Sequence, residues 1–254
     1  MESDYTIFRA PGMTGKVLNT GSNCVFDPVS LLCLPDDPKF CCKRGNTVQA
    51  AADGTFFVKR ICHRTLWDSF RNLFKRPRPE LCLEAAGRLE RAGVATPSVL
   101  AICRQYRGFL PRFDFLITED IGAKVVFADK MPHSQQTISE LCALLAKMHA
   151  NGIEHGDVNL RNLYRCKDSG SWGAIDLDGC RLNLSPLSAD RRIHELARFS
   201  SSLIKQARCM DMAADFPEDP AGFAARQYKL CSGLDPDTSI YRRRVEYLSQ
   251  RRRK

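Results

Sequence analysis

Two short polar turns constrain this chain more than any other part of its sequence. The first, HGDVNLRN at residues 155–162, carries Asp157 and, five residues later, Asn162. The second follows the apolar run at residues 172–175 and begins with Asp176. Carboxylate and amide oxygens suit Mg²⁺, and a carboxylate can accept a proton from a hydroxyl group. Asp and Asn are also common in solvated turns, so either turn alone would be weak support for a site.

Together the two turns have the layout of a phosphoryl-transfer site. In such sites one Asp accepts the proton of the attacking hydroxyl, while an Asn and a second Asp hold the Mg²⁺ ions that bridge the nucleotide phosphates. The spacing of Asp157 and Asn162 equals that of the protein-kinase catalytic loop, in which Asn comes five residues after the Asp of His-Arg-Asp. Here Gly156 replaces the Arg. The pair of turns therefore predicts phosphoryl transfer.

The segment before the first turn is predicted to be a helix that leads directly into the turn. Thr137 and Glu140 have the spacing of a capping box, and Gly152 stands where a left-handed C-terminal cap belongs. We expect His149 in this helix to be packed rather than to bind a ligand. Apolar residues recur at helical spacing between the two ends: Ile138, Leu141, Leu144, Leu145 and Met148.

A strand hairpin and a lysine precede these turns in the chain. A turn that contains Gly can place its backbone N–H groups over nucleotide phosphates, and the following strand can present a lysine to the α- and β-phosphates. Lys59 is that candidate, although it could equally be a solvated strand lysine. The expected strands are residues 40–44, 48–51 and 55–60, joined by the turns Gly45-Asn46-Thr47 and Asp53-Gly54.

Two helices are expected next. In the first, Trp67, Phe70, Leu73 and Phe74 lie at helical spacing among basic residues. Such a helix can rest on a membrane surface, but we expect its apolar face to pack on the protein. The second spans residues 81–92 and carries Glu84, our choice to pair with Lys59, since kinase-type sites use a Glu there.

Strands are predicted at residues 98–102 and 113–120, and a hinge at Ile121-Gly122. Backbone groups at such a hinge can hydrogen-bond adenine, so Glu119 is a candidate nucleotide contact. After the second polar turn, the apolar pattern predicts helices at residues 193–204, from Asp219-Pro220 to Gly233, and at residues 240–250. Residues 1–38 contain scattered Gly and Pro, so we expect an irregular N-terminal extension there.

Composition and charge indicate a cytoplasmic protein with an anionic partner. The chain has 254 residues, a net charge of +9 and twelve cysteines without zinc spacing, which favours reduced thiols in a cytoplasmic protein. The first residues do not form a secretory signal, and no apolar run is long enough to span a bilayer. Basic runs at residues 59–78 and 241–254 suit an anionic partner such as a membrane surface or a phosphorylated glycolipid. No nucleic-acid-binding motif accompanies the charge, so we expect no nucleic acid.

From about residue 39 to 205 the chain resembles the heptose and Kdo kinases of the lipopolysaccharide core in Gram-negative bacteria, a branch of the protein-kinase-like superfamily. The resemblance is carried by residues 43–48, 57–60, 67–74, 93–97 and 115–120 and by the two polar turns. It implies that Asp157 is the catalytic base and that Asn162 and Asp176 bind metal. Glu84 lies closer to Gly93 than is typical of the family, so Glu80 is the alternative partner of Lys59.

The resemblance implies an α+β, two-lobed protein-kinase-like fold. Its N-lobe, residues 39–120, would be a small antiparallel sheet with one regulatory-type helix, and its mainly helical C-lobe would span residues 121–254 with a basic C-terminal helix. ATP and Mg²⁺ would be the cofactors. The acceptor would be a heptose hydroxyl, in preference to Kdo, on the core glycolipid at the cytoplasmic face of the inner membrane. Alternatives are a kinase for a soluble small molecule or a protein, and a non-catalytic scaffold at the membrane surface.

Overall fold

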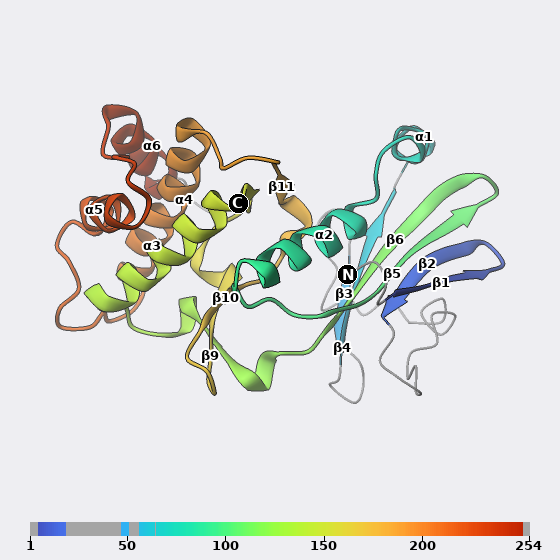
Figure 1. Ribbon diagram of the computed structural model, residues 1–254, viewed down its shortest axis with the longest axis horizontal. Coiled ribbons are helices and arrows are strands. Elements are labelled where there is room, and N and C mark those ends of the chain that lie inside the picture. The colour runs from blue at the N-terminus through green and yellow to red at the C-terminus, as the bar shows by residue number, and fades with distance from the viewer. Residues whose placement is uncertain (1–4, 19–46, 51–55, 64, 251–254) are drawn as a thin grey trace. The chain divides into compact units, whose positions relative to one another are not determined.

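The computed structural model describes residues 5–18, 47–50, 56–63 and 65–250 (Figure 1). The chain divides into two compact units by its internal contacts. The sheet unit comprises residues 1–87 and 97–121, and the helical unit comprises residues 88–96 and 122–254. The fold is mixed α and β, as the sequence predicts, with antiparallel strands dominating one unit and helices the other.

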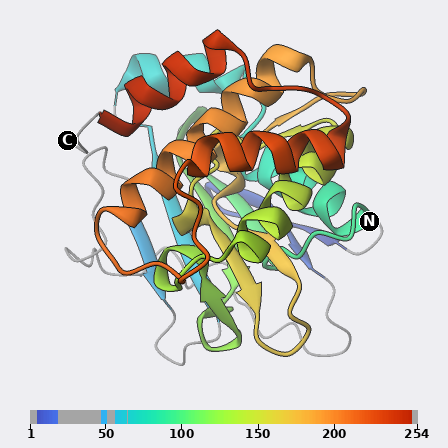
Figure 2. The same ribbon diagram turned by 90° about the vertical axis from the view of Figure 1, so that its left-hand side faces the viewer.

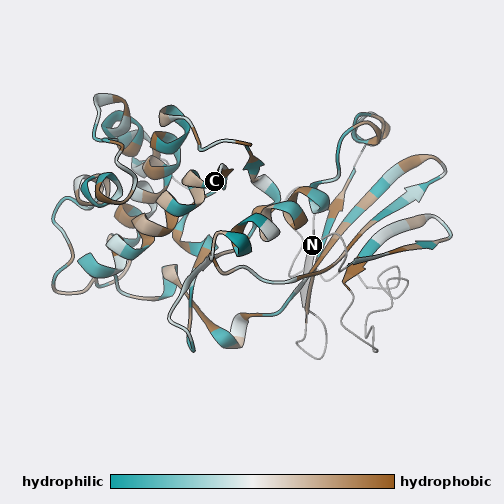
Figure 3. Ribbon diagram, viewed as in Figure 1, coloured by the Kyte–Doolittle hydropathy of each residue, from teal (hydrophilic) through white to brown (hydrophobic). Residues whose placement is uncertain are grey.

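Within its described part, the sheet unit has one antiparallel sheet of six strands in the order β1-β2-β5-β6-β4-β3. Figure 3 shows both hydrophobic and hydrophilic residues along β5 and β6, and β5 begins with a hydrophobic run at residues 99–103. A buried cluster on this sheet includes Val58 of β4, which lies opposite Ile117 of β6. The strands are β1 (Tyr5–Ala10), β2 (Met13–Leu18), β3 (Thr47–Ala50), β4 (Phe56–Cys62), β5 (Val99–Arg107) and β6 (Leu110–Glu119).

The prediction of an irregular N-terminal extension is wrong for residues 5–18, which form the β1–β2 hairpin. β2 pairs with β5, and Met13 and Val17 are buried in the sheet's core. The glycines in this stretch belong to the hairpin instead of breaking it. Gly15 lies inside β2, where an added Cβ would be only 2.2 Å from the carbonyl oxygen of Ile102. A side chain would therefore not fit at this close approach of two strands. The predicted strand at residues 40–44 lies outside the described residues.

Two helices follow β4: α1 (Leu66–Leu73) and α2 (Arg78–Arg91), which continues beyond the sheet unit after Gly87. α1 begins at Thr65, whose hydroxyl accepts a hydrogen bond from the Asp68 N–H at 3.0 Å. The prediction that the apolar face of α1 packs on the protein is wrong. Trp67, Phe70 and Phe74 are exposed and Leu73 is half-buried, whereas Ser69 is the residue of this helix that is buried.

Four α-helices and several short strands make up most of the described part of the helical unit. α3 packs on α5, and α4 packs on α5 and α6, an arrangement that Figures 1 and 2 show in green, orange and red. None of the helices in the described part of the chain is long and apolar enough to cross a bilayer. The elements are α3 (Gln135–Ala150), α4 (Ala189–Ala207), α5 (Pro220–Ser232), α6 (Ser239–Gln250), β7 (Val125–Phe127), β8 (Ile153–Glu154), β9 (Leu163–Cys166), β10 (Trp172–Ala174) and β11 (Arg181–Leu182).

Most helix ends follow the predicted signals, with one correction at α3. Ser134 caps this helix by accepting a hydrogen bond from the Thr137 N–H at 3.1 Å, so α3 begins one turn earlier than the predicted capping box. Glu140 instead accepts a hydrogen bond from the indole N–H of Trp172 at 2.8 Å. The left-handed Gly152 after α3 is confirmed, with φ at +71°.

Candidate active site

The first polar turn is closed by the side chain of Asn162. Its Nδ2 donates to the carbonyl oxygen of Asp157 at 2.9 Å and lies 3.3 Å from the carboxylate oxygen Oδ2 of the same residue. Asn162 is almost buried, whereas Asp157 is exposed. Because the amide nitrogen is used within the turn, the amide oxygen Oδ1 is the atom with which Asn162 can bind a cation. The turn thus fixes a carboxylate and an amide oxygen together on one short segment.

The second polar turn is joined to the first by backbone hydrogen bonds. The Ile175 N–H donates to the carbonyl oxygen of Asn162 at 2.9 Å, and the Ile175 carbonyl oxygen lies 2.9 Å from Nε2 of His155. Asp176 is the next residue, so its backbone begins beside the first turn. The structure therefore brings Asp157, Asn162 and Asp176 to adjacent turns of the helical unit.

Asp176 has an unusual backbone conformation. With φ at 62° and ψ at 51°, it is left-handed, and it is the one non-glycine residue with positive φ in the described part of the chain. Asp tolerates this region better than most residues, although it still carries strain. Such strain is commonly stored at functional sites, where the surrounding structure imposes it.

Gly156 is required where the two turns meet. Its φ is +83°, and an added Cβ would lie 2.5 Å from the carbonyl oxygen of Gly179, at the end of the second turn. No side chain fits there, which accounts for glycine at the position where protein kinases carry Arg.

We expect Gly156→Ala to destabilise the protein and reduce its activity, because the new Cβ adds a backbone clash to left-handed strain of about 1–2 kcal/mol. Gly179→Ala is the matched control, since a Cβ there would lie 3.6 Å from the carbonyl oxygen of His155, an ordinary contact. Urea unfolding of both variants measures the difference. Equal stability of the two variants would contradict the tight packing of the turns.

A buried carboxylate holds the backbone of the first turn. The sequence analysis did not assign this residue to the site. Glu195 of α4 accepts hydrogen bonds from the N–H groups of His155 at 2.7 Å and Gly156 at 3.0 Å. Arg198, one turn later, donates to the carbonyl oxygen of Gly156. Burial alone would raise the pKa of Glu195, but its interactions with His149 and His155 outweigh burial and lower it. The ionised carboxylate therefore ties the turn to α4.

Helical spacing offers one signal for Glu195, because it shares a buried stripe of α4 with Phe199 and Ser202. Its neighbour His149 is packed, as predicted. This histidine is buried and its Nδ1 lies 2.7 Å from the hydroxyl of Tyr228.

The other predicted site residues belong to the sheet unit. Lys59 lies on β4, opposite Leu116 of β6. Glu84 of α2 accepts a hydrogen bond from Nη1 of Arg76 at 2.5 Å, and Glu80 accepts one from Nε of the same arginine at 3.4 Å. Both acids thus share one arginine, and the pairing of either with Lys59 stays a prediction.

The predicted nucleotide contacts are placed only in part. Gly45 and Asn46 lie outside the described residues, and Thr47 is the first residue of β3. Glu119 ends β6, where its N–H donates to the carbonyl oxygen of Ser98 at 3.0 Å. The nucleotide-binding roles of these residues, and of Lys59, stay predictions.

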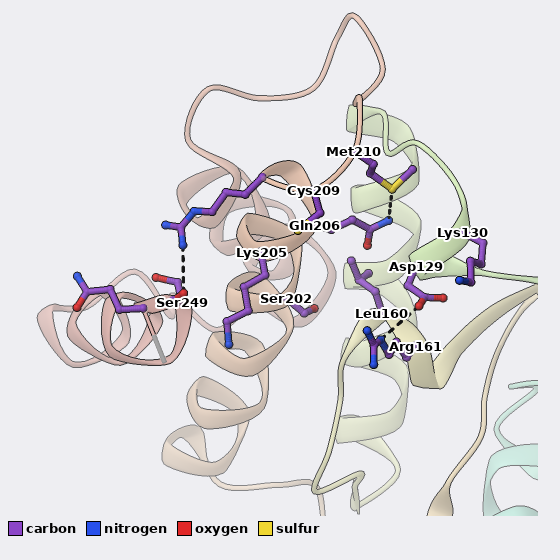
Figure 4. A pocket seen from close by; sticks show the side chains of 12 residues that line it. Asp129, Lys130, Leu160, Arg161, Ser202, Lys205, Gln206, Cys209, Met210 and Ser249 are labelled. Carbon is purple, nitrogen blue, oxygen red and sulfur yellow. Dashed lines mark hydrogen bonds and ion pairs between the residues drawn. The ribbon is translucent and has the colours of Figure 1, made fainter. Parts of the chain in front are cut away.

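A cavity of about 710 Å³ lies next to the first polar turn (Figure 4). Leu160 and Arg161 of that turn form part of its wall, and α4 and α6 contribute much of the rest. Arg161 pairs with Asp129 at 3.4 Å, the one acidic residue in the lining. Four cationic residues line the cavity: Lys130, Arg161, Lys205 and Arg208. The cavity therefore suits an anionic molecule. Sequence analysis missed it because its walls are far apart in the chain.

The donor set of the two turns fits Mg²⁺ bound together with a nucleotide. Among the described residues, no three His, Cys, Asp or Glu side chains cluster as a metal site of their own. Mg²⁺ typically takes only one or two protein ligands and completes its shell with water and phosphate oxygens. The amide oxygen of Asn162 and the carboxylate of Asp176 would be those ligands.

Comparison with known proteins gives a family match and a likeness of fold. The model of the lipopolysaccharide kinase (Kdo/WaaP) family matches residues 43–218. The solved structure described as WaaP in complex with acyl carrier protein has a TM-score of 0.59 at 18% identity, covering 89% of this chain and 95% of that chain. The bifunctional kinase-methyltransferase WbdD has a TM-score of 0.42 at 13% identity, covering 77% of this chain and 45% of that chain. A search of curated proteins found no match.

Proposed function

Because the chain belongs to the lipopolysaccharide kinase (Kdo/WaaP) family, we propose that it transfers the γ-phosphate of ATP to a sugar hydroxyl of the lipopolysaccharide inner core, on heptose in preference to Kdo. The observation that carries this proposal is the pair of hydrogen-bonded turns that bears Asp157, Asn162 and Asp176. Their residue types and spacing are those of a phosphoryl-transfer site.

Asp157 is the general base in this proposal. Its carboxylate is exposed and oriented by Asn162, so it can accept the proton of an incoming sugar hydroxyl. Glu195 and Arg198 hold the backbone of the turn and thereby keep the carboxylate in position. When bound through Asn162 and Asp176, Mg²⁺ would neutralise charge on the phosphate oxygens.

Lys59 would contact the α- and β-phosphates of ATP, and Glu84 or Glu80 would orient its ammonium group. The backbone of the turn at Gly45, Asn46 and Thr47 would cover the phosphates, and Glu119 would lie at the adenine end. These roles follow from the family resemblance and from the order of the residues in the chain.

The cationic cavity beside the first polar turn is the proposed site for an anionic part of the acceptor. Four cations against one acid line it, and Arg161 connects it directly to the turn that carries the catalytic base. A phosphorylated core glycolipid carries the negative charge that this cavity would neutralise. Such an acceptor also places the reaction at the cytoplasmic face of the inner membrane.

Neutralising a cavity lysine should weaken acceptor binding selectively. We expect Lys205→Gln to raise the KM for core lipopolysaccharide about tenfold or more and to leave the KM for ATP unchanged, since a hydrogen bond to a charged group contributes about 1.5–3 kcal/mol. Lys229→Gln is the control, because Lys229 pairs with Asp235 away from the cavity lining. An unchanged KM for the acceptor, or a raised KM for ATP, would contradict this assignment.

A panel of acceptors tests the proposed function itself. Purified protein is incubated with Mg-ATP and either lipopolysaccharide from a strain lacking its core kinase, soluble sugars or a generic protein substrate. We expect phosphate on the lipopolysaccharide alone. Transfer only to a soluble sugar or to protein would overturn the assignment of the acceptor. A lack of transfer together with a lack of thermal stabilisation by millimolar Mg-ATP would favour a non-catalytic scaffold.

A further inference from the structure

We infer that the exposed aromatic face of α1 docks on an anionic phospholipid surface. This face consists of Leu66, Trp67, Phe70 and Phe74, whose exposed fractions are 79%, 70%, 47% and 76%. The three rings form one continuous surface, with centroids 6.0 Å apart for Trp67–Phe70 and 5.4 Å apart for Phe70–Phe74. A contiguous apolar patch of this kind marks an interaction surface more often than scattered exposed residues do.

The orientation of α1 is fixed by a polar network on its opposite face. Ser69 is buried, and the Asn72 side chain donates to Nδ1 of His63 at 3.2 Å. His63 in turn contacts Asp114 at 3.1 Å, and Asp114 forms a buried pair with Arg104 at 2.7 Å. Arg104 also donates to the carbonyl oxygen of Asn72 at 3.3 Å.

Because this network holds the polar side of α1 against the sheet, the rings on the opposite side are exposed. An amphipathic helix normally turns its apolar side toward the core, whereas α1 turns a small and polar side inward. Burial alone would raise the pKa of Asp114, but hydrogen bonds from His63 and Arg104 outweigh burial and lower it. The charged carboxylate thus anchors the helix with its aromatic side outward.

Cationic side chains lie near the aromatic face. Arg71, which pairs with Asp68 at 3.6 Å, and Lys75 are exposed on or next to α1. A cavity of about 380 Å³ adjoins the start of the helix, and its lining joins Thr65, Leu66 and Ser69 to Arg107 and Arg112 at the β5–β6 hairpin. Two guanidinium groups beside an apolar helix can bind lipid phosphates while the rings enter the acyl boundary.

The β5–β6 hairpin, which lines this cavity together with α1, carries a further exposed aromatic residue. Phe109, at the tip of the β5–β6 turn, is 74% exposed and lies between the two cavity arginines in the sequence. Exposed aromatic residues with interspersed cations are typical of membrane-interface segments, in which Trp favours the headgroup level. This charge complementarity selects an anionic bilayer as the occupant of the surface.

The inference deepens the proposed function, because a lipid-linked acceptor requires the enzyme to work at a membrane. The residues that support the inference nevertheless all belong to the sheet unit, and the inference does not depend on the two polar turns. Lipid binding can therefore be measured without ATP or acceptor, so that failure of the inference and failure of the proposed function are distinguishable.

Fluorescence of Trp67 provides a direct test. The chain has two tryptophans, and Trp172→Phe leaves Trp67 as the only one. We expect vesicles of phosphatidylcholine and phosphatidylglycerol to shift its emission to the blue, and bromine-labelled lipids to quench it. Pure phosphatidylcholine vesicles should have a much smaller effect, because the cations then lack a partner.

Vesicle co-sedimentation with matched variants identifies the surface. We expect Trp67→Ser with Phe70→Ser and Phe74→Ser to weaken binding to the anionic vesicles about tenfold or more. The control is Leu184→Ser with Leu230→Ser, since these exposed leucines of the helical unit lie outside the proposed surface. Both variants replace exposed side chains, and thermal unfolding confirms that each remains folded.

Several outcomes would overturn the inference. The aromatic variant could bind vesicles as tightly as the control, which would place lipid binding elsewhere, for example on the basic C-terminus. Trp67 emission could be blue in the absence of lipid, which would show that another part of the chain covers the face. The emission could shift with protein concentration instead of lipid, which would show self-association.

Discussion

We expect Asp157→Asn to lower the rate of phosphate transfer to the core acceptor by about 10²–10⁴-fold, the usual contribution of a general base. The substitution keeps the size of the side chain and retains an oxygen that can accept the hydrogen bond from Asn162. Binding of ATP should persist, because the proposed base would act on the acceptor hydroxyl and not on the nucleotide. The loss should therefore appear in kcat, with little change in the thermal stabilisation by Mg-ATP.

Asp168→Asn is the matched control for this variant, since Asp168 is exposed in the turn between β9 and β10. Its transfer rate should equal that of the wild type. Wild-type transfer by Asp157→Asn would show that another group takes the proton, and the catalytic assignment of the first turn would be wrong.

Asp176→Asn should abolish the Mg²⁺-dependent part of nucleotide binding. Asparagine tolerates the left-handed backbone of this residue, so the variant removes the carboxylate charge without adding backbone strain. Each tenfold loss of affinity corresponds to about 1.4 kcal/mol. Isothermal titration of ATP with and without Mg²⁺ measures the effect directly.

The neighbouring acid gives a stringent comparison. Asp178 lies two residues later in the same turn, and Asp178→Asn should leave Mg-ATP binding largely intact. If the effects of the two substitutions were reversed, Asp178 would be the metal ligand and the alignment of this turn with kinase sequences would need to shift.

The two polar turns are predictable from sequence because the contacts that shape them are local. Asp157 and Asn162 belong to one turn, and the hydrogen bonds between them span only five residues. The helices are likewise marked by local signals, such as Asp219, which caps α5 through the Gly222 N–H at 2.9 Å. Spacing and cap residues are sufficient for features of this kind.

The features that sequence reasoning missed depend on contacts between distant segments. Glu195 is about forty residues from the turn that it supports, and the sequence of its own helix does not indicate which backbone groups it binds. Gly15 is one of the scattered glycines on which the expectation of an irregular N-terminus was based, whereas its place in β2 depends on the close approach of β5. The inward face of α1 is selected by Arg104 and Asp114, which lie on strands that follow it in the chain.

Mass spectrometry of the core oligosaccharide tests the central claim most directly. The host is a strain without its own core kinase, which is supplied with the wild-type chain, with Asp157→Asn or with nothing. We expect one additional phosphate on an inner-core sugar, heptose by preference, only when the wild-type chain is present. Identical masses in all three samples, with the protein folded and present, would contradict it.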